Sequence, residues 1–361
     1  MGKGKLKVAI VGCGKFADAH AEAIRNQQRA ELIAVCDAEP LMAEQLASRY
    51  GVPFQFDDLD EMLSAVRPDI VHIATPPQSH RAIALKAMDA GCHIFVEKPL
   101  AMNYGEARCI IEHAERTGRK LTTGWRAHYD PPALRLRELV SQGVIGEPVH
   151  IESFYGYDLS GPFGTVFRSD RDHWIHALPG KIFHNNIDHL LNKFTDFMQT
   201  DEQPAVVAQA YSYAEHGPAE LDDELRIMLR CGPITGYATF SANVRPMAHT
   251  LVVYGTKQTL SVDYVARTVT LGAESKLPGA IGRLISPFTQ ARRFCGEGVR
   301  NVLRFARSED HFFAGLNQLI GALYTSVLEN TPPPISYKDM LWVNAVMEDV
   351  VSQIDTRMVR I

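Results

Sequence analysis

The stretch VAIVGCGKFADAHAEAI, residues Val8–Ile24, decides the fold of the first part of this chain. An apolar run leads into two glycines, Gly12 and Gly14, and a segment with helical spacing of apolar residues follows. Apolar strand, glycine-rich turn and helix in this order form the first half of a βαβ unit. The question is whether the glycines only make a turn or let the backbone touch a ligand.

The glycines belong to a longer motif. Gly12, Gly14 and Ala17 have the G-x-G-x-x-[GA] spacing. In that spacing the first glycine permits the tight turn, the second lets the backbone approach a pyrophosphate, and the alanine keeps the helix close to the sheet. Lys15 and Phe16 then lie at the helix N-terminus, where backbone amides and the helix dipole favour an anion. The motif predicts dinucleotide binding, with a purely structural turn as the alternative.

An acidic residue supports this interpretation. Asp37 ends the second apolar run, ELIAVCD, 20 residues after Ala17. A carboxylate at this place suits a ribose 2′-hydroxyl and repels a 2′-phosphate. The sequence therefore favours NAD as the cofactor, and NADP stays open because neighbouring cations can reverse the preference.

The pattern of apolar runs predicts two domains. As far as Trp125, short β-rich runs alternate with helical patterns, which is typical of a parallel sheet covered on both faces. Between residues 205 and 271, strand-like runs follow one another without helices, which indicates a largely antiparallel sheet. We expect an α/β Rossmann domain at residues 1–124 for NAD(P), and an α+β domain with a large, mainly antiparallel open sheet at residues 125–361 for substrate and oligomerisation.

Composition excludes several classes of protein. The formal net charge of −5 gives no general reason to bind nucleic acid. The six cysteines form no C-x-x-C pair, so neither a disulfide framework nor a zinc site is expected, and we predict no metal ligands. No signal-peptide pattern and no apolar run of the roughly 18 residues needed for a bilayer crossing occurs. These features predict a cytoplasmic protein without a transmembrane segment.

Four further stretches carry a family resemblance: IATPPQSH (73–80), VEKPLAMN (96–103), GWRAHYDPPALRLRELVSQGVIGEPVHI (124–151) and VVYGTKQTLSVD (252–263). Together with the glycine motif they resemble the Gfo/Idh/MocA family, named for glucose–fructose oxidoreductase, inositol dehydrogenase and a rhizopine-catabolism protein. The resemblance extends from Lys5 to about Asp263, and its most specific element is the E-K-P triplet, Glu97–Pro99.

The resemblance implies an NAD(P)-dependent oxidoreductase that acts on a CH–OH group of a sugar, polyol or nucleotide sugar. It implies a nicotinamide held between the two domains against the open sheet, and a cis peptide before Pro99. It places Lys98 at the active site, and it brings residues after the fourth and fifth strands to the cofactor: Thr75, Pro76, His80, Glu97 and Lys98.

The residues themselves support a role for Lys98. A lysine directly after an apolar parallel strand lies at the carboxyl edge of the sheet, where such sheets bind ligands. There it can donate to a substrate oxygen, and desolvation can lower its pKa. A solvated lysine beyond a strand end is the alternative.

The family's second catalytic patch is a D-x-G-x-H segment that opens a helix. In LPGKIFHNNIDHLLNKF, Asn185 takes the acidic position and His189 the histidine position. They are i, i+4 neighbours, and with Asn192 they are expected on a polar helix face opposite the apolar residues. His189 would be the general base, while Asn185 cannot ionise and can only orient. A shifted alignment that uses His184 and Asp188 stays open, as does an ordinary solvated face.

Two basic regions bear on the substrate. A long predicted loop at residues 157–180 and the segment after the sixth strand offer cations and aromatic rings suited to a sugar face and a phosphate: Arg126, Arg168, Arg171, Trp174 and His176. A solvated loop is the alternative. A second region, residues 283–307, places arginines among apolar residues and predicts a basic amphipathic helix. It could face a membrane surface, an anionic substrate or a subunit.

Three functions therefore remain open from the sequence. The first is a sugar, polyol or nucleotide-sugar dehydrogenase. The second is a glycoside hydrolase that uses tightly held NAD as a transient oxidant, and the third is a non-catalytic dinucleotide sensor on the same fold. The resemblance also implies a homodimer or homotetramer that pairs through the open sheet.

Overall fold

The structure is a computed structural model that describes residues 4–161, 164–165, 169–170, 172–213, 222–273, 277–307 and 313–355. The chain divides into two compact units, the first made of Met1–Arg126 and Gly315–Glu348, the second of Ala127–Ala314 and Asp349–Ile361. The sequence-based boundary at 124/125 lies two residues from this division. Residues 315–348, placed in the second domain by sequence order, cluster instead with the first unit, because their apolar side chains pack there.

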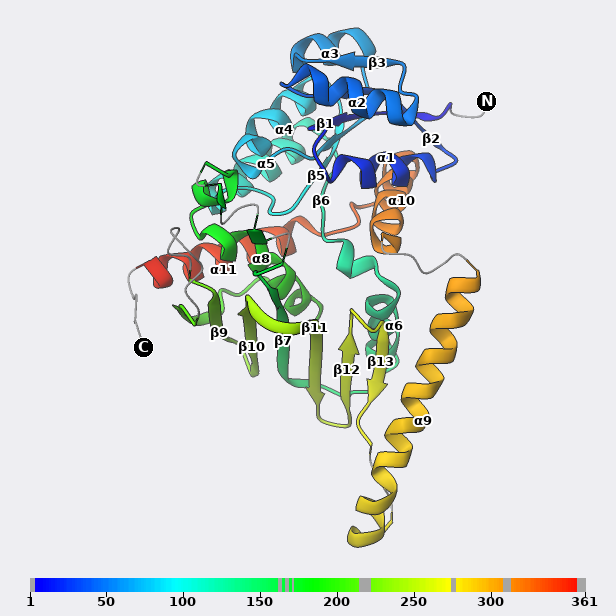
Figure 1. Cartoon of the computed structure of the whole chain (residues 1–361), viewed down its shortest axis with the longest axis vertical. Coiled ribbons are helices and arrows are strands. Elements are labelled where there is room, and N and C mark those ends of the chain that lie inside the picture. Colours follow the sequence, from blue (N-terminus) through cyan, green and yellow to red (C-terminus); the bar gives the residue numbers. More distant parts are fainter. Residues whose placement is uncertain are drawn as a thin grey trace. The chain divides into compact units, whose positions relative to one another are not determined.

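The first unit alternates strands and helices (Figure 1). Its elements are β1 (Leu6–Val11), α1 (Ala17–Arg25), β2 (Ala30–Cys36), α2 (Pro40–Tyr50), β3 (Phe54–Phe56), α3 (Leu59–Val66), β4 (Ile70–Ile73), η1 (Pro77–Ser79), α4 (His80–Asp89), β5 (His93–Val96), α5 (Tyr104–Thr117), β6 (Leu121–Thr123), α10 (Ala314–Glu329) and the first part of α11 (Tyr337–Asp355). The six strands form a parallel sheet in the order β3-β2-β1-β4-β5-β6. This arrangement confirms the predicted Rossmann fold.

Local signals explain why these elements begin where they do. Asp58 caps α3 by accepting from the backbone N–H of Glu61 at 2.8 Å, and Asn103 caps α5 by accepting from Glu106 at 2.9 Å. The strands β1, β4 and β5 are almost wholly buried, as continuous apolar runs in a parallel sheet should be.

The sheet order fixes where a ligand can bind. β1 lies between β2 and β4, so the chain reverses its winding at this point. The loops that follow β1 and β4 are therefore neighbours, and the Ala74 N–H donates to the Val11 carbonyl at 2.8 Å. In doubly wound folds this crevice at the carboxyl ends of the strands is the dinucleotide site.

The second unit is an α+β domain. Its elements are η2 (Arg126–Tyr129), α6 (Pro131–Ser141), β7 (Pro148–Asp158), η3 (Trp174–Ala177), α8 (Lys181–Leu191), η4 (Asn192–Asp196), β8 (Ala205–Tyr211), β9 (Glu224–Cys231), β10 (Ile234–Ser241), β11 (Asn243–Gly255), β12 (Thr259–Asp263), β13 (Thr268–Leu271) and α9 (Gly279–Ala306). Seven strands form one sheet in the order β13-β12-β11-β7-β10-β9-β8, with only the β7–β10 pair parallel.

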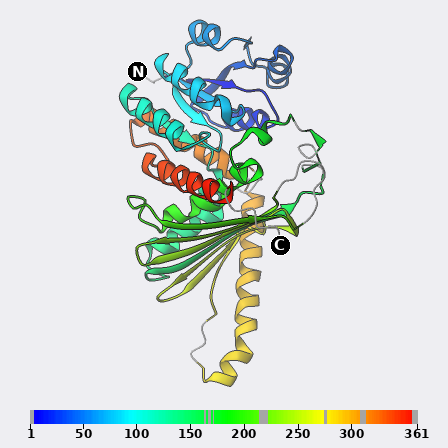
Figure 2. The ribbon, with the colours of Figure 1, turned by 90° about the vertical axis from the view of Figure 1, so that its left-hand side faces the viewer.

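This sheet is covered on one face by α6 and α8 (Figure 2). Side chains on the inner face, such as Leu251 and Leu260, are buried, whereas the outer face exposes Val207, Met228 and Tyr237. The predicted open, mainly antiparallel sheet is therefore confirmed. Among the helices of the described residues, none combines the length and the hydropathy that crossing a bilayer requires.

Candidate active site

The two glycines in the loop after β1, Gly12 and Gly14, differ in their surroundings. Gly12 has a φ of +92°, and a Cβ on it would lie 2.7 Å from backbone atoms of Ala74 and Thr75. The fold itself therefore requires a glycine at position 12. A Cβ on Gly14 would meet no described atom within 4 Å, and its backbone lies outside the left-handed region. The protein leaves the space over Gly14 open, as a backbone that receives a ligand must.

The residues around the loop prepare it for an anion. Ala17 is buried, and its N–H donates to the Gly14 carbonyl at 2.9 Å, so α1 begins directly after the loop. Lys15 is exposed and Phe16 half-buried at the N-terminus of α1. No side-chain hydrogen bond caps this end of α1, and an uncapped helix N-terminus is a place where an anion can bind.

Asp37 follows β2 and holds the loop in place. Its carboxylate accepts from the backbone N–H of Cys13 at 2.6 Å and from that of Glu39 at 2.9 Å. A carboxylate has about four acceptor positions, so it can still accept from ribose hydroxyls. Asp37 is half-buried beside the loop, as the predicted ribose contact requires.

The loop after β4 contains three residues predicted to bind the cofactor. Thr75 is half-buried and accepts from the Ser79 hydroxyl at 2.7 Å, and Pro76 is exposed. His80 is fully buried, and its ring nitrogens lie 2.9 Å from the Thr75 carbonyl and 3.1 Å from the Pro99 carbonyl. Burial lowers the pKa of His80, against the effect of these carbonyls. His80 thus joins the loops after β4 and β5 and presents no ring nitrogen to a ligand.

The E-K-P triplet follows β5, and its Lys98–Pro99 peptide bond is cis, as the resemblance implied. Glu97 is only 8% exposed, and its two oxygens contact His20 Nε2 at 3.0 Å and the Lys98 backbone N–H at 3.2 Å. Burial acts to raise the pKa of Glu97, but the hydrogen bond and charge of His20 together with the Lys98 charge outweigh it and lower the pKa. An ionised carboxylate therefore lies in a fixed position beside Lys98.

Glu97 ends a buried chain of hydrogen bonds that sequence reasoning missed. His20 Nδ1 lies 2.9 Å from His72 Nδ1, and His72 Nε2 lies 2.9 Å from the Tyr324 hydroxyl. Burial lowers the pKa of His72 well below its usual range, so His72 is neutral. The tautomers of His20 and His72 decide the direction of these bonds, and one arrangement that satisfies all three has Tyr324 donating to His72, His72 donating to His20 and His20 donating to the Glu97 carboxylate. Each histidine is an isolated residue in the sequence, and only the fold brings them together.

In the second unit, α8 presents the predicted histidine. Asn185 and His189 are half-buried one turn apart, whereas His184 and Asp188 are only 4% and 2% exposed. Asn185 and His189 are thus the more accessible of the two candidate pairs. The His189 ring centroid lies 5.1 Å from that of Tyr155 on β7.

Further rings surround His189 on the inner face of the sheet. The centroid of His249, on β11, lies 6.2 Å from that of His189 and 4.9 Å from that of Tyr155. The ring centroid of Tyr264 lies 4.7 Å from that of His249. Sequence reasoning did not find Tyr155, His249 or Tyr264, since they come from β7, β11 and the turn after β12, distant segments whose pairing the sequence does not give.

One expectation for this helix was wrong. Asn192 was predicted with Asn185 and His189 on a polar face opposite the buried apolar residues, but it is only 1% exposed. The backbone is still α-helical at Leu191 (φ −74°, ψ −36°) and at Asn192 (φ −57°, ψ −28°), so Asn192 keeps its place on the helix and is buried because other parts of the unit cover it. Its carbonyl accepts from His128 Nε2 at 2.9 Å.

Lys193 is a second residue that the sequence analysis missed. It is 2% exposed, its ammonium donates to the His189 carbonyl, and it lies 5.1 Å over the Tyr264 ring. Burial lowers the pKa of Lys193 to about 7, although Asp188 opposes the shift. A lysine of this pKa exchanges its proton near neutral pH, which is unusual and often marks a functional site. Its i+4 spacing from His189 was the available signal.

The depressed pKa predicts a pH-dependent stability. The unfolded chain keeps the ordinary lysine pKa near 10.5, so above pH 7 it binds more protons than the folded chain, and the cost of burying Lys193 falls as the pH rises. Lys193→Met should therefore be more stable than the wild type at pH 6, by about 2–5 kcal/mol, and the gain should shrink toward pH 10. Urea unfolding at both pH values measures this difference. A destabilisation of equal size at both values would contradict it.

The residues predicted to choose the substrate are only partly described. Arg126, at the start of η2, is half-buried, as are Trp174 and His176 in η3, directly before α8. The Trp174 ring centroid lies 5.4 Å from that of His173, so η3 presents a small aromatic surface. Arg168 and Arg171 lie outside the described residues.

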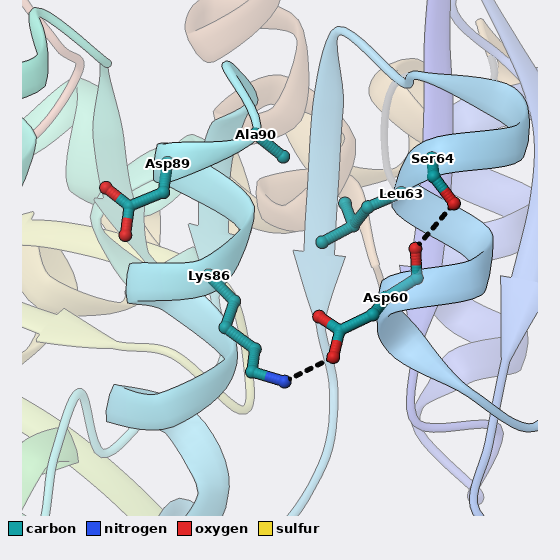
Figure 3. Close-up of a pocket in the computed structure, with 6 residues that line it drawn as sticks. All are labelled: Asp60, Leu63, Ser64, Lys86, Asp89 and Ala90. Carbon is teal, nitrogen blue, oxygen red and sulfur yellow. Dashed lines mark hydrogen bonds and ion pairs between the residues drawn. The ribbon is translucent and has the colours of Figure 1, made fainter.

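An open hollow of about 370 Å³ on the first unit is not this site. It lies between α3 and α4 and contains an exposed ion pair, in which the Lys86 ammonium lies 2.7 Å from an Asp60 carboxylate oxygen (Figure 3). The Ser64 hydroxyl donates to the Asp60 carbonyl at 2.8 Å. None of the six lining residues comes from the loops after β1, β4 or β5.

Two family models match the chain. Residues 6–125 match the oxidoreductase family with the NAD-binding Rossmann fold, and residues 133–261 match the GFO/IDH/MocA C-terminal domain. Together these matches cover most of the chain and correspond to the two architectures described above.

Curated relatives match over part of the chain. D-glucoside 3-dehydrogenase of Escherichia coli is 39% identical over 143 residues, 39% of this chain and 41% of that protein. Inositol 2-dehydrogenase of Rhizobium meliloti is 31% identical over 157 residues, 44% of this chain and 47% of that protein. The chain thus spans less than half the length of these two relatives.

Solved structures share the fold over nearly the whole chain. The WlbA dehydrogenase from Bordetella pertussis, in complex with NADH and UDP-GlcNAcA, has a TM-score of 0.79 at 17% identity and covers 99% of this chain and 97% of its own. UDP-N-acetylglucosamine 3-dehydrogenase GnnA from Acidithiobacillus ferrooxidans has a TM-score of 0.75 at 18% identity and covers 98% of each chain.

Proposed function

Since this chain belongs to the Gfo/Idh/MocA family of oxidoreductases, whose first domain is an NAD-binding Rossmann fold, we propose that it transfers a hydride between NAD and a hydroxyl-bearing carbon of a sugar, polyol or nucleotide sugar. The observation that carries the proposal is the open backbone at Gly14, located at the switch point between β1 and β4. NAD, when bound, supplies the hydride acceptor or donor.

The first unit binds and orients the dinucleotide. The amides at the N-terminus of α1 hold the pyrophosphate over Gly14, and Asp37 accepts from the adenosine ribose. Asp37 already anchors the Cys13 amide, so the same carboxylate fixes both the loop and the ribose. A second negative charge on a 2′-phosphate would be repelled here, which favours NAD over NADP.

Lys98 acts on the substrate oxygen. Its ammonium donates to that oxygen and stabilises the negative charge that develops on it. The backbone N–H of Lys98 is held by Glu97, which is fixed in turn by His20. The buried chain from Tyr324 to Glu97 thus positions Lys98 without contacting the substrate.

His189 acts as the general base for the hydroxyl proton. A histidine with its usual pKa is suited to this transfer near neutral pH. Asn185, one turn earlier on α8, cannot stabilise an imidazolium as a carboxylate would, so its part is to orient His189 or a substrate hydroxyl. The rings of Tyr155 and His249 restrict the position of the His189 ring.

The substrate class follows from the relatives and from the aromatic η3 segment. D-glucoside and inositol dehydrogenases are among the relatives, and structures of similar fold are named for UDP-sugars. We assign Trp174 and His176 to the sugar face, and Arg126 with Arg168 and Arg171 to an anionic part of a nucleotide sugar.

The oligomer and the compartment complete the proposal. The outer face of the second-unit sheet exposes Val207, Met228 and Tyr237, an apolar surface that supports pairing as a homodimer or homotetramer. All six cysteines are free thiols, and most are buried, which supports a working place in the reducing cytoplasm.

One other function has an observation in its favour. A glycosyl hydrolase family 109 protein of Shewanella is 31% identical over 163 residues, 43% of this chain and 36% of that protein. Such an enzyme would cleave a glycoside without net formation of NADH. A non-catalytic dinucleotide sensor would bind NADH without catalysing a reaction of any substrate.

The test is the formation of NADH and NADPH from a panel of polyols, free sugars, glycosides and nucleotide sugars. We expect turnover with one of these classes and faster reaction with NAD than with NADP. Glycoside cleavage at constant NADH would overturn the dehydrogenase in favour of the hydrolase. NADH binding without any turnover across the panel would favour the sensor.

A further inference from the structure

The long helix α9 turns its apolar side away from the sheet of the second unit. Large apolar residues that are more than half exposed recur along it, with exposed fractions of 71% for Leu284, 76% for Phe288, 68% for Val302 and 76% for Phe305. Ile281, Phe294, Val299 and Leu303 are also more than half exposed. Most of these residues recur every three or four positions, so they share one face of the helix. We name this set, from Ile281 to Phe305, the apolar face of α9.

The opposite face is polar and holds α9 to the edge of the sheet. Arg293 donates to the carbonyls of Leu271 and Gly272, and Glu297, only 6% exposed, accepts from the Val269 N–H at 3.1 Å. One turn further, Asn301 donates to the Ala266 carbonyl at 3.0 Å. A surface helix normally buries its apolar stripe and exposes its polar one. On α9 the polar stripe contacts the sheet and the apolar stripe is exposed, so packing within the second unit does not explain the apolar face.

The charge of α9 has one sign. Its exposed ionisable side chains are arginines, among them Arg283, Arg292 and Arg300, followed by Arg307 at its C-terminal cap. The sole acidic residue, Glu297, is buried and paired with Arg300. The helix therefore presents apolar side chains and positive charge together.

The length of α9 makes the face accessible. At 28 residues it extends about 42 Å, roughly three times the length of β13 beside it. The hydrogen bonds to the sheet region come from Arg293, Glu297 and Asn301, and the N-terminal half of α9 runs past the end of β13 (Figures 1 and 2). That half carries Leu284 and Phe288, the most exposed apolar residues of its first turns.

Two occupants could cover the face, and charge decides between them. In a pair of α9 helices from two copies, the exposed charges would all be positive, because the one acidic residue of α9, Glu297, is buried and already paired with Arg300. An anionic bilayer surface offers phosphates to the arginines and an acyl boundary to Leu284, Phe288 and Phe305. We propose that α9 docks the protein on an anionic lipid surface, lying in the interface with its apolar face inserted. This proposal is independent of the catalytic one.

The experiment is co-sedimentation of the full-length protein with vesicles. Phosphatidylcholine vesicles are compared with vesicles of phosphatidylcholine and phosphatidylglycerol. We expect binding to the anionic vesicles only, weakened by salt. The double variant Phe288→Ser, Val302→Ser and the charge reversal Arg283→Glu, Arg292→Glu should each weaken this binding at least about tenfold. A control variant, Leu41→Ser with Phe54→Ser, removes two apolar residues of the first unit that are also more than half exposed, 55% and 52%, and should leave vesicle binding unchanged.

Three results would overturn the proposal. The first is absence of the wild-type protein from the anionic vesicle pellet. The second is equal binding by the α9 variants and the wild type. The third is a lower oligomer mass of the Phe288→Ser, Val302→Ser variant without vesicles, by sedimentation velocity, which would assign the face to a second copy. All six substituted residues are exposed, and unchanged unfolding temperatures will show that the variants are folded.

Discussion

Lys98→Met is expected to lower kcat by about a hundredfold to a thousandfold, the usual effect of removing a donor to a developing oxyanion. Methionine keeps a long unbranched side chain and removes only the ammonium, so the packing beside Glu97 and Pro99 is preserved. The affinity for NADH should change by less than about threefold, since the pyrophosphate and ribose contacts lie after β1 and β2. Steady-state kinetics and NADH fluorescence titration separate the two effects.

Lys86→Met is the matched control for this change. Lys86 is an exposed lysine on α4 whose ammonium pairs with Asp60, so its loss should leave kcat unchanged. If Lys98→Met kept wild-type turnover, the assignment of Lys98 to the substrate oxygen would be wrong. The double variant Lys98→Met, His189→Ala adds a further check. Its loss of kcat should be smaller than the product of the two single losses, because both groups act on one reacting oxygen.

The parts of the site that could be predicted from the sequence are local in the chain. The G-x-G-x-x-A turn, Asp37 after the second strand and the E-K-P triplet all depend on residue types at short, fixed distances from a strand end. Their positions at the carboxyl ends of β1, β2 and β5 follow from the parallel sheet, which the alternation of apolar runs predicted.

The parts that could not be predicted depend on contacts between distant segments. His20 and Glu97 are 77 positions apart, and His72 and Tyr324 are 252 apart. No periodicity in the sequence relates such residues. The same holds for Tyr155 and His249, which lie side by side because β7 pairs with β11. Asn192 was misplaced for a different reason: helical spacing shows which residues share a face, but not which part of that face other elements of the unit cover.

The helix α9 could be predicted from the sequence only in part. Its amphipathic pattern and its arginines were visible in the sequence, and they left three kinds of partner open. The structure shows which side meets the sheet: Arg293, Glu297 and Asn301 contact β13 and its flanks, so the apolar face points away. Periodicity gives the existence of a face but not its direction, because a core-facing and a solvent-facing stripe have the same spacing.

The two loop glycines allow the cofactor site to be tested apart from the fold. Gly14→Val places a branched side chain where no described atom of the protein lies within 4 Å of the added Cβ. The free energy of unfolding without cofactor should therefore change by less than about 1 kcal/mol. If a pyrophosphate lies over this backbone, the same side chain will occupy its place, and the Kd for NADH should rise at least about a hundredfold.

Gly12→Ala should behave in the opposite way. The φ of +92° and the 2.7 Å approach to Ala74 and Thr75 leave no room for a methyl group. The strained backbone and the overlap should cost about 2–4 kcal/mol of stability in the absence of cofactor. Urea unfolding of both variants, with and without NADH, gives the comparison. Loss of stability in Gly14→Val with unchanged NADH affinity would mean that Gly14 serves the turn alone, and the dinucleotide would have to bind elsewhere.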